Sequence, residues 1–322
     1  MSRPAPVPPV PQRPLRLGTR ASALATSQSG WVADRLRAAG VETELVHVRT
    51  EGDASRASLR QIGGTGVFAS ALRDALRESR IDLAVHSLKD LPTAPEPGLV
   101  VAAVPEREDP RDALVARDGL TLHGLPPGAS VGTGSPRRAA QLTLVRPDLD
   151  VRDIRGNVGT RIDLVRGGRL DAVVLACAGL SRLGRLDEAT DLLDPDVMLP
   201  AAGQGALAVE CRTDDEPLVT LLRDVLEHAP TRAAVTAERA VLARLEAGCT
   251  APVGALARAG ADGALALTAF VALRDLPLRH AETGSDPVAL GHEVADHLLS
   301  RPDPVVTGSD GAAATGSFPT GA

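Results

Sequence analysis

Residues 15–39 read Leu15-Arg16-Leu17-Gly18-Thr19-Arg20-Ala21-Ser22 and then ALATSQSGWVADRLRAA, a short apolar strand, a glycine turn and a helical pattern in direct succession. The same alternation continues with expected strands at 44–48, 81–86 and 98–104 and an expected helix at 68–79. Short strands that alternate with helices are typical of a doubly wound sheet whose strands run parallel. The sequence therefore predicts an α/β domain at the beginning of the chain.

Two further bodies are predicted from the rest of the chain. A second series of strands and helices follows the proline-bearing segment 105–112, and a Gly-rich turn at 202–205 then leads into a strand that returns the chain to the first domain. From about residue 230 the pattern changes to a long helix, a strand pair and a last helix, which predicts a small α+β domain. The expected boundaries are 15–105 with 200–226, 106–199 and 227–301, between disordered tails at 1–14 and 302–322.

The overall charge argues against a nucleic-acid partner. The chain carries a formal net charge of −6, and its aromatic side chains are three Phe and one Trp, with no Tyr. Nucleic-acid binders rely on a basic surface and on aromatic rings that stack on bases. We therefore expect no nucleic-acid partner, and any bound anion must meet a local cluster of basic residues.

The cysteines and the hydropathy indicate a reducing compartment. Cys177, Cys211 and Cys249 are an odd number with no CxxC pair, so the sequence predicts neither a disulfide framework nor a zinc site. No apolar run approaches the roughly 18 residues that span a bilayer. The proline-rich beginning of the chain also lacks the apolar stretch of a signal peptide. We expect a cytoplasmic protein without a membrane partner.

Lys89 is the one lysine in a chain with 35 basic residues, and Asp90 follows it in the stretch His86-Ser87-Leu88-Lys89-Asp90. Lys is a compact ammonium whose pKa moves readily, whereas Arg is a planar fork that stays charged. A carboxylate beside it can stabilise a developing cation and relay a proton, because the ammonium keeps the carboxylate ionised. Codon bias and an ordinary surface ion pair are alternatives that the composition leaves open.

Three strand-to-helix junctions combine a helix cap with arginine. Each cap leaves backbone N–H groups and the positive end of a helix dipole facing outward, which favours an anion. Arg adds paired hydrogen bonds to carboxylates, and the junctions of an open α/β sheet gather at one edge. Glycine turns with solvated arginines are the alternative. The caps are Ser22, Ser135 and Asn157, and the arginines are Arg20, Arg137, Arg138, Arg155 and Arg161.

Cys249 differs in its setting from the other two cysteines. Cys177 and Cys211 come at the ends of apolar strands, whereas Cys249 follows Gly248, which is expected to end a helix. A cysteine in a loop can be exposed and reactive, although most single cysteines are inert. The local pattern alone leaves both interpretations open.

Seven ordered motifs between residues 15 and 300 together resemble the porphobilinogen deaminase (hydroxymethylbilane synthase) family. The stretches RGNVGTR and HSLKD are specific to that family, and seven motifs in the same order are improbable by chance. The motifs are LGTRAS at 17–22, AVHSLKD at 84–90, VGTGSPRR at 131–138, RGNVGTR at 155–161, ACAGLSRL at 176–183, PAAGQG at 200–205 and LEAGC at 245–249.

The resemblance implies a transferase of porphyrin and haem biosynthesis. Such an enzyme condenses four porphobilinogen molecules head to tail on a covalent dipyrromethane cofactor, releases ammonia each time, and frees the linear tetrapyrrole by hydrolysis. By position, Cys249 is the attachment residue through a thioether, and Asp90 is the catalytic carboxylate. The implied fold is two domains like those of periplasmic binding proteins plus a third that carries the cysteine. The family is usually monomeric and uses no metal.

The resemblance also implies which residues line the site. Thr65 stands where many relatives have a lysine, so the contribution of its loop stays open. A non-catalytic binding protein for a polycarboxylate ligand is the alternative function, because such folds are shared with solute receptors. The residues expected to hold the cofactor, besides Cys249, are Ser87, Lys89, Asp90, Thr133, Ser135, Arg137, Arg138, Arg155, Gly156 and Asn157. Those expected to bind substrate are Arg20, Ser22, Arg155, Arg161, Arg182 and Gln204.

Overall fold

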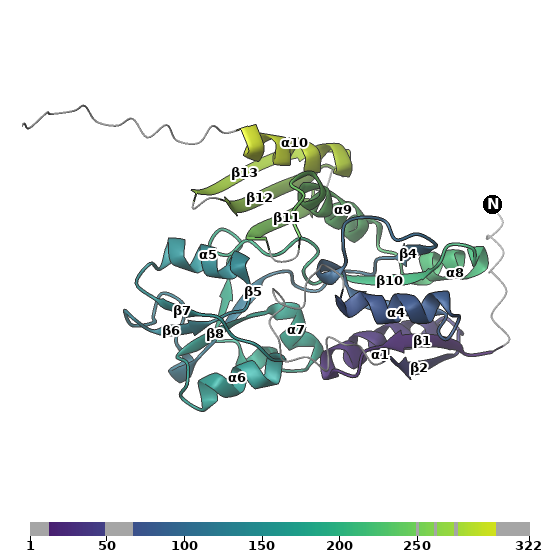
Figure 1. The fold of residues 1–322 in the computed structure, drawn as a ribbon, viewed down its shortest axis with the longest axis horizontal. Coiled ribbons are helices and arrows are strands. Elements are labelled where there is room, and N and C mark those ends of the chain that lie inside the picture. Colours follow the sequence, from purple (N-terminus) through teal and green to yellow (C-terminus); the bar gives the residue numbers. More distant parts are fainter. Residues whose placement is uncertain (1–12, 49–66, 249–250, 261–262, 274–275, 301–322) are drawn as a thin grey trace, which may run out of the picture.

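The structure is a computed structural model that describes residues 13–48, 67–248, 251–260, 263–273 and 276–300. The described residues form three bodies, each built on its own sheet (Figure 1). This arrangement confirms the predicted fold class of two doubly wound α/β domains and a small α+β domain. Thr65 and Cys249 lie outside the described residues.

The first sheet has five strands in the order β2-β1-β3-β10-β4. Leu17 on β1 and Leu83 on β3 are fully buried, and they pack against Leu36 of one covering helix and Leu222 of another. The strands are β1 (Leu15–Thr19), β2 (Thr43–His47), β3 (Leu83–Ser87), β4 (Leu99–Ala103) and β10 (Leu207–Arg212). The helices are α1 (Ala23–Ala38), α4 (Val67–Arg77) and α8 (Glu216–Leu226), and a short 3-10 turn, Leu88–Asp90, follows β3.

The second sheet repeats this plan in the order β7-β6-β8-β5-β9. Its core contains Leu114, Val131, Leu142 and Val174, which are all fully buried. The strands are β5 (Asp112–Ala116), β6 (Ser130–Gly132), β7 (Asp150–Arg152), β8 (Ala172–Ala176) and β9 (Asp191–Leu193). The helices are α5 (Pro136–Val145), α6 (Val158–Arg166) and α7 (Cys177–Arg182), with 3-10 turns at Arg117–Gly119 and Leu186–Glu188.

The expectation that the strands run parallel was wrong for one strand in each sheet. β10 is antiparallel to both of its neighbours, β3 and β4, and β5 is antiparallel to β8 and β9. Both strands come directly after the two segments that cross between the domains, about 105–111 and 200–206. A chain that enters a sheet at the edge where the parallel strands end must run in the opposite direction, so the crossings determine these two orientations.

The third body is a three-stranded antiparallel sheet, β11-β12-β13, covered by two helices. The sequence predicted only a strand pair, because the third strand is largely polar and carries Arg279, His280 and Glu282. The two helices touch closely at Gly291, where an added Cβ would lie 2.5 Å from the carbonyl oxygen of Ala237. The elements are α9 (Ala229–Arg244), β11 (Val253–Ala259), β12 (Leu265–Leu273), β13 (Leu276–Gly284) and α10 (Pro287–Ser300).

The three predicted helix caps are confirmed. Ser22 Oγ accepts a hydrogen bond from Ala25 N at 3.3 Å, and Ser135 Oγ accepts one from Arg138 N at 3.4 Å. Asn157 Oδ1 accepts one from Thr160 N at 2.9 Å. These caps depend on residues within one helical turn, which explains why the sequence alone identified them.

Arg13, which lies in the tail expected to be disordered, binds the folded part of the chain. Its guanidinium donates two hydrogen bonds of 2.8 Å to Asp82, which is buried directly before β3 and also binds Arg16. Burial alone would raise the pKa of the Asp82 carboxyl, but these hydrogen bonds hold that pKa well below its usual range. The pair therefore fixes the chain just ahead of β1.

Within the described ranges, no helix is long and apolar enough to cross a membrane.

Glu238 on α9 joins the third body to both crossing segments. Its fully buried carboxylate lies 2.6 Å from Arg107 Nη1 and accepts backbone hydrogen bonds from Gly203 at 2.6 Å and Ala257 at 2.9 Å. Arg107 precedes β5, and Gly203 precedes β10. One side chain thus ties α9, β11 and both connections between the two α/β domains.

Glu238→Gln should lower the free energy of unfolding by about 3 kcal/mol, because it leaves the Arg107 guanidinium, whose side chain is only 10% exposed, without its counter-ion. Urea unfolding followed by circular dichroism measures this change. Glu293→Gln, on the exposed face of α10, is the matched control and should stay within about 0.5 kcal/mol of the parent. Equal stability of the two variants would show that the Glu238 contacts do not hold the three bodies together.

Candidate active site

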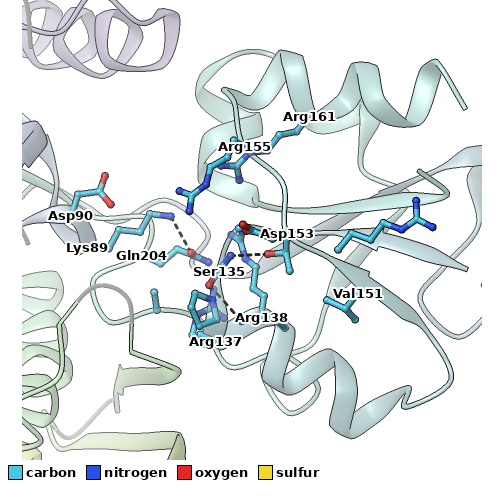
Figure 2. Close-up of a pocket in the computed structure, with 16 residues that line it drawn as sticks. Lys89, Asp90, Ser135, Arg137, Arg138, Val151, Asp153, Arg155, Arg161 and Gln204 are labelled. Atoms are coloured by element: carbon cyan, nitrogen blue, oxygen red, sulfur yellow. Dashed lines mark hydrogen bonds between the residues drawn. The ribbon is translucent and has the colours of Figure 1, made fainter. Parts of the chain in front are cut away.

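A cavity of about 420 Å³ lies between the two α/β domains (Figure 2). The 3-10 turn after β3 forms one wall, and the loops after β6 and β7 form the other, so the carboxyl ends of strands from both sheets face the same space. Ligands of open α/β sheets bind at this edge. The lining residues include one lysine, five arginines and two aspartates, namely Lys89, Arg137, Arg138, Arg152, Arg155, Arg161, Asp90 and Asp153.

Lys89 reaches across the cavity floor from the first domain. Its Nζ donates a hydrogen bond to Gln204 Oε1 at 3.2 Å, and Figure 2 shows the ammonium and the Arg155 guanidinium directed into the same space. Burial lowers the pKa of Lys89 to about 8, although the negative charge of the adjacent Asp90 opposes this shift. Lys89 is therefore cationic at neutral pH but titrates in the mildly alkaline range.

Arg137 and Arg138 start α5 and are almost completely buried, with exposures of 3% and 6%. Arg138 Nη2 lies 2.7 Å from Asp112 Oδ1, and Arg137 Nη1 lies 2.8 Å from Asp112 Oδ2. Arg137 also donates a hydrogen bond of 2.6 Å to the carbonyl oxygen of Leu199. The sequence analysis missed Asp112, because no local pattern shows that the crossing strand brings it beneath two arginines.

Arg161 shows how closely the positive charges are packed. Its Nε donates to the carbonyl oxygen of Gly156 at 2.8 Å. Burial lowers the pKa of Arg161 to about 10, and repulsion by Arg138 and Arg155 contributes to the shift. Crowded guanidinium groups of this kind favour a ligand that brings several negative charges.

Nine of the residues predicted from the sequence line this cavity together. Thr133 and Ser135 adjoin each other, since the hydroxyl of Thr133 accepts a hydrogen bond from Ser135 N at 3.2 Å. Arg152 at the end of β7 and Asp153 after it also line the cavity but were not predicted, because the sequence has no recognisable motif at these positions. The predicted residues found here are Lys89, Asp90, Thr133, Ser135, Arg137, Arg138, Arg155, Arg161 and Gln204.

Six other predicted residues do not line this cavity. Ser87 Oγ accepts a hydrogen bond from Gln28 Nε2 at 2.9 Å, and Arg182 Nη2 donates one of 2.7 Å to the carbonyl oxygen of Gly205. α1 touches α7, since Ser27 Oγ donates to the carbonyl oxygen of Arg182 at 2.5 Å. The residues outside the lining are Arg20, Ser22, Ser87, Gly156, Asn157 and Arg182.

The fold and the cavity define a class of protein: two α/β domains and a small third domain, with a cationic cleft for a ligand that carries several negative charges. A family model described as "Porphobilinogen deaminase, dipyromethane cofactor binding domain" matches residues 15–220, and one described as "Porphobilinogen deaminase, C-terminal domain" matches residues 232–300. The chain belongs to the porphobilinogen deaminase family.

Named relatives agree with the family models. The porphobilinogen deaminase of Thermobifida fusca is 61% identical over 263 residues, which cover 81% of this chain and 82% of that one. Porphobilinogen deaminase 1 of Streptomyces coelicolor is 55% identical over 307 residues, which cover 90% and 96%. A solved periplasmic binding protein of Salmonella typhimurium is also similar, with 15% identity and a TM-score of 0.36 over 66% of this chain and 91% of that one.

These findings establish the activity. The chain is a transferase of porphyrin biosynthesis with hydroxymethylbilane synthase function, uses porphobilinogen as substrate and carries a dipyrromethane cofactor. Nothing favours the alternative of a non-catalytic polycarboxylate receptor. Within the described ranges, no group of three or more His, Cys, Asp or Glu side chains is placed to hold a metal ion.

The residues of the cavity fit dipyrromethane. Its two pyrrole rings carry acetate and propionate groups, which accept hydrogen bonds from guanidinium N–H groups. The Nε atoms of Arg137 and Arg155 are buried and have no hydrogen-bond partner among the described residues. Buried donors are normally satisfied, so both atoms fit a ligand that supplies carboxylate oxygens at this wall.

Proposed function

We propose that this cavity is where porphobilinogen units are joined, with Asp90 as the catalytic residue. The observation that carries the proposal is the crowding of five arginines and Lys89 around a space that Asp90 also lines. The arginines match the acetate and propionate groups of every pyrrole unit. The carboxylate matches the positive charge that develops on a pyrrole ring when ammonia leaves.

The side chains of the cavity have different roles in the reaction. When bound, dipyrromethane supplies the pyrrole end to which the first porphobilinogen is joined. Asp90 accepts a hydrogen bond from the N–H of the reacting pyrrole and stabilises the positive charge of that ring, because a fixed carboxylate needs little reorganisation as the charge appears. The Lys89 ammonium lines the same cavity and adds a positive charge beside Asp90. Arg155 and Arg161 hold the carboxylate side chains of the substrate and of the growing chain.

The remaining predicted residues extend this assignment along the cleft. We assign Arg20, Ser22 and Arg182 to substrate carboxylates on the side where α1 meets α7. A Cβ placed on Gly179 of α7 would lie 3.9 Å from both Leu24 and Val158. The beginnings of α1 and α6 therefore converge on α7, which supports a second basic surface for the elongating product. Ser87, Gly156 and Asn157 are assigned to the cofactor side of the same cleft.

Cys249 is our proposed attachment residue for dipyrromethane. Cys177 and Cys211 are buried, and burial raises the pKa of each thiol to about 12. Neither forms an appreciable amount of the thiolate nucleophile at neutral pH. Of the three cysteines, this leaves Cys249, which the structure does not describe. Gly254 nearby on β11 lies against the backbone of Leu199 and Pro200, next to the lining residue Ala201.

Lys89→Arg should lower kcat/KM at least about tenfold although the charge is kept, because a broad guanidinium must displace Gln204 or intrude on the cavity. The charged groups that face Lys89 are Asp90, Asp112, Arg137 and Arg138. In the parent, kcat/KM should fall as pH rises through the pKa of Lys89, since the ammonium is lost. That alkaline decline should disappear in the variant, because Arg stays charged.

Steady-state ammonia and hydroxymethylbilane assays between pH 6 and 10 test this prediction, with denaturing intact mass to confirm that dipyrromethane is loaded. Arg35→Lys on α1 is the reverse exchange at a position whose guanidinium stacks on Trp31, and it should leave the profile unchanged. Full activity of Lys89→Arg with the same alkaline decline would assign the lone lysine to codon bias.

We also propose the domain boundaries given above, a cytoplasmic location and a monomer. The reducing compartment is supported by Cys177 and Cys211, which are free thiols. The net negative charge supports the absence of a nucleic-acid partner, and the expected absence of a membrane partner rests on the hydropathy of the sequence. The monomer rests on the family resemblance, and light scattering of the purified protein tests it directly.

A further inference from the structure

Asp112 is completely buried at the edge of the second sheet that faces the cavity. It is the first residue of β5 and pairs with Ala176, the last residue of β8. Because β5 runs antiparallel to its neighbours, its beginning lies where the parallel strands end. Asp112 is therefore placed behind the cavity wall by the crossing of the chain between the domains.

The carboxylate of Asp112 is shared by three side chains from two segments, the first turn of α5 and the second crossing. Oδ1 accepts hydrogen bonds from Arg138 Nη2 at 2.7 Å and Nε at 3.2 Å, and from Gln204 Nε2 at 2.8 Å. Oδ2 lies 2.8 Å from Arg137 Nη1. Gln204 in turn accepts from Lys89 Nζ, so hydrogen bonds run from the first domain to the second through this one carboxylate.

The charges explain why such an anion is needed there. Two guanidinium groups with only a few per cent of exposure each cost several kcal/mol to desolvate unless a counter-ion pairs with them. Burial alone would raise the pKa of Asp112, but the charges of Arg137 and Arg138 hold it well below its usual range. One carboxylate between two guanidiniums also leaves a positive excess for a ligand.

We propose that Asp112 is a positioning residue for the condensation reaction, which holds Arg137 and Arg138 so that their remaining N–H groups face carboxylates in the cavity. Asp112 does not line the cavity, so it acts through the arginines that it binds. Arg137 lines the cavity, and its buried Nε, which has no hydrogen-bond partner among the described residues, is one donor that this arrangement leaves unused. The proposal rests on the assigned role of the two arginines.

The chain contains a matched comparison in Asp82. This aspartate is also buried. It binds Arg13 and Arg16 at 2.8 Å and lies 3.8 Å from Arg212, but it precedes β3 and so lies at the opposite edge of its sheet. A variant that removes either charge leaves the arginines around it without that counter-ion. Of these two aspartates, only Asp112 binds residues that line the cavity. Comparing the two variants therefore separates a loss of stability from an effect on the cavity.

Asp112→Asn and Asp82→Asn should be compared by thermal unfolding, by denaturing intact mass for loaded dipyrromethane, and by kcat and KM across pH. Both should lose thermal stability. Asp112→Asn alone should raise the KM for porphobilinogen about tenfold, because it weakens a charge-assisted hydrogen bond at the site. It should also shift the alkaline decline of kcat/KM to lower pH, since Lys89 loses a nearby negative charge.

An unchanged KM and pH profile in a loaded, folded Asp112→Asn protein would overturn the proposal and leave Asp112 a structural residue. If that variant does not fold, Asp112→Ser is assayed with and without formate. The proposal is supported if formate restores the KM of Asp112→Ser and only inhibits the parent. It is overturned if formate does not restore the KM of the variant. Arg138→Gln separates the role of the arginines from that of Asp112. A normal KM in Arg138→Gln contradicts the assignment of the arginines. A raised KM in Arg138→Gln together with a normal KM in Asp112→Asn contradicts only the role proposed for Asp112.

Discussion

Asp90→Asn should lower kcat by about a thousandfold while the KM for porphobilinogen stays within a few fold of the parent. The carboxylate is assigned to stabilise positive charge on the pyrrole, and removing one preorganised group of this kind costs about 10²–10⁴ in rate. The amide keeps the shape and one acceptor oxygen but loses the charge. The arginines that we assign to the substrate's carboxylates are untouched, so binding should survive.

The measurement is single-turnover ammonia release together with intact mass of enzyme-bound pyrrole chains. The variant should bind porphobilinogen but accumulate the earliest complexes, because each condensation is slow. Asp224→Asn, an exposed aspartate on α8, is the matched control and should behave like the parent. Near-parental turnover of Asp90→Asn would contradict the catalytic role of Asp90. Asp153, which also lines the cavity, would then be the next candidate for that role.

Local features of the fold were predictable because their causes lie within a few residues. Ser135 followed by Pro136 indicated a helix start, and the structure has Ser135 capping α5 with Pro136 in its first turn. The same holds for Asn157 and α6. Residues at such junctions gather at the carboxyl edge of the sheet, so the sequence alone could assign Arg137 and Arg155 to one site.

The features that the sequence did not predict depend mostly on contacts between distant parts of the chain. The direction of β5 depends on where the chain crosses between the domains, and that crossing also determines the burial of Asp112. The long-range pairing of Glu238 with Arg107 spans 131 residues, and no periodicity reports it. The strand β13 was missed because it is an edge strand with polar side chains, whose pattern resembles a loop.

These non-local contacts concentrate on the two crossing segments. Arg107 and Asp112 lie on or directly after the first crossing, while Gly203 and Gln204 lie on the second. Glu238 binds Arg107 and Gly203, and Asp112 binds Gln204. The connections between the domains are thus tied both to the third body and to the arginines of the cavity, so the same residues stabilise the assembly and orient the site.

Cys249→Ala should abolish the covalent adduct and, with it, product formation. The denaturing intact mass of the parent should exceed the chain mass by two pyrrole units, whereas the variant should show the chain mass alone. The chemical reason is that a thiolate traps the electrophile formed when porphobilinogen loses ammonia. The other described thiols cannot substitute, because burial raises the pKa of both Cys177 and Cys211 to about 12.

Cys211→Ala is the matched control, since it removes a thiol that β10 buries completely. It should cost some stability through the lost packing but keep the adduct and the activity. An active parent that shows only the unmodified chain mass would contradict covalent attachment altogether. An adduct that persists in Cys249→Ala and disappears in Cys211→Ala would instead mean that β10 opens to expose its thiol, because a buried side chain with a raised pKa reacts only after such an opening.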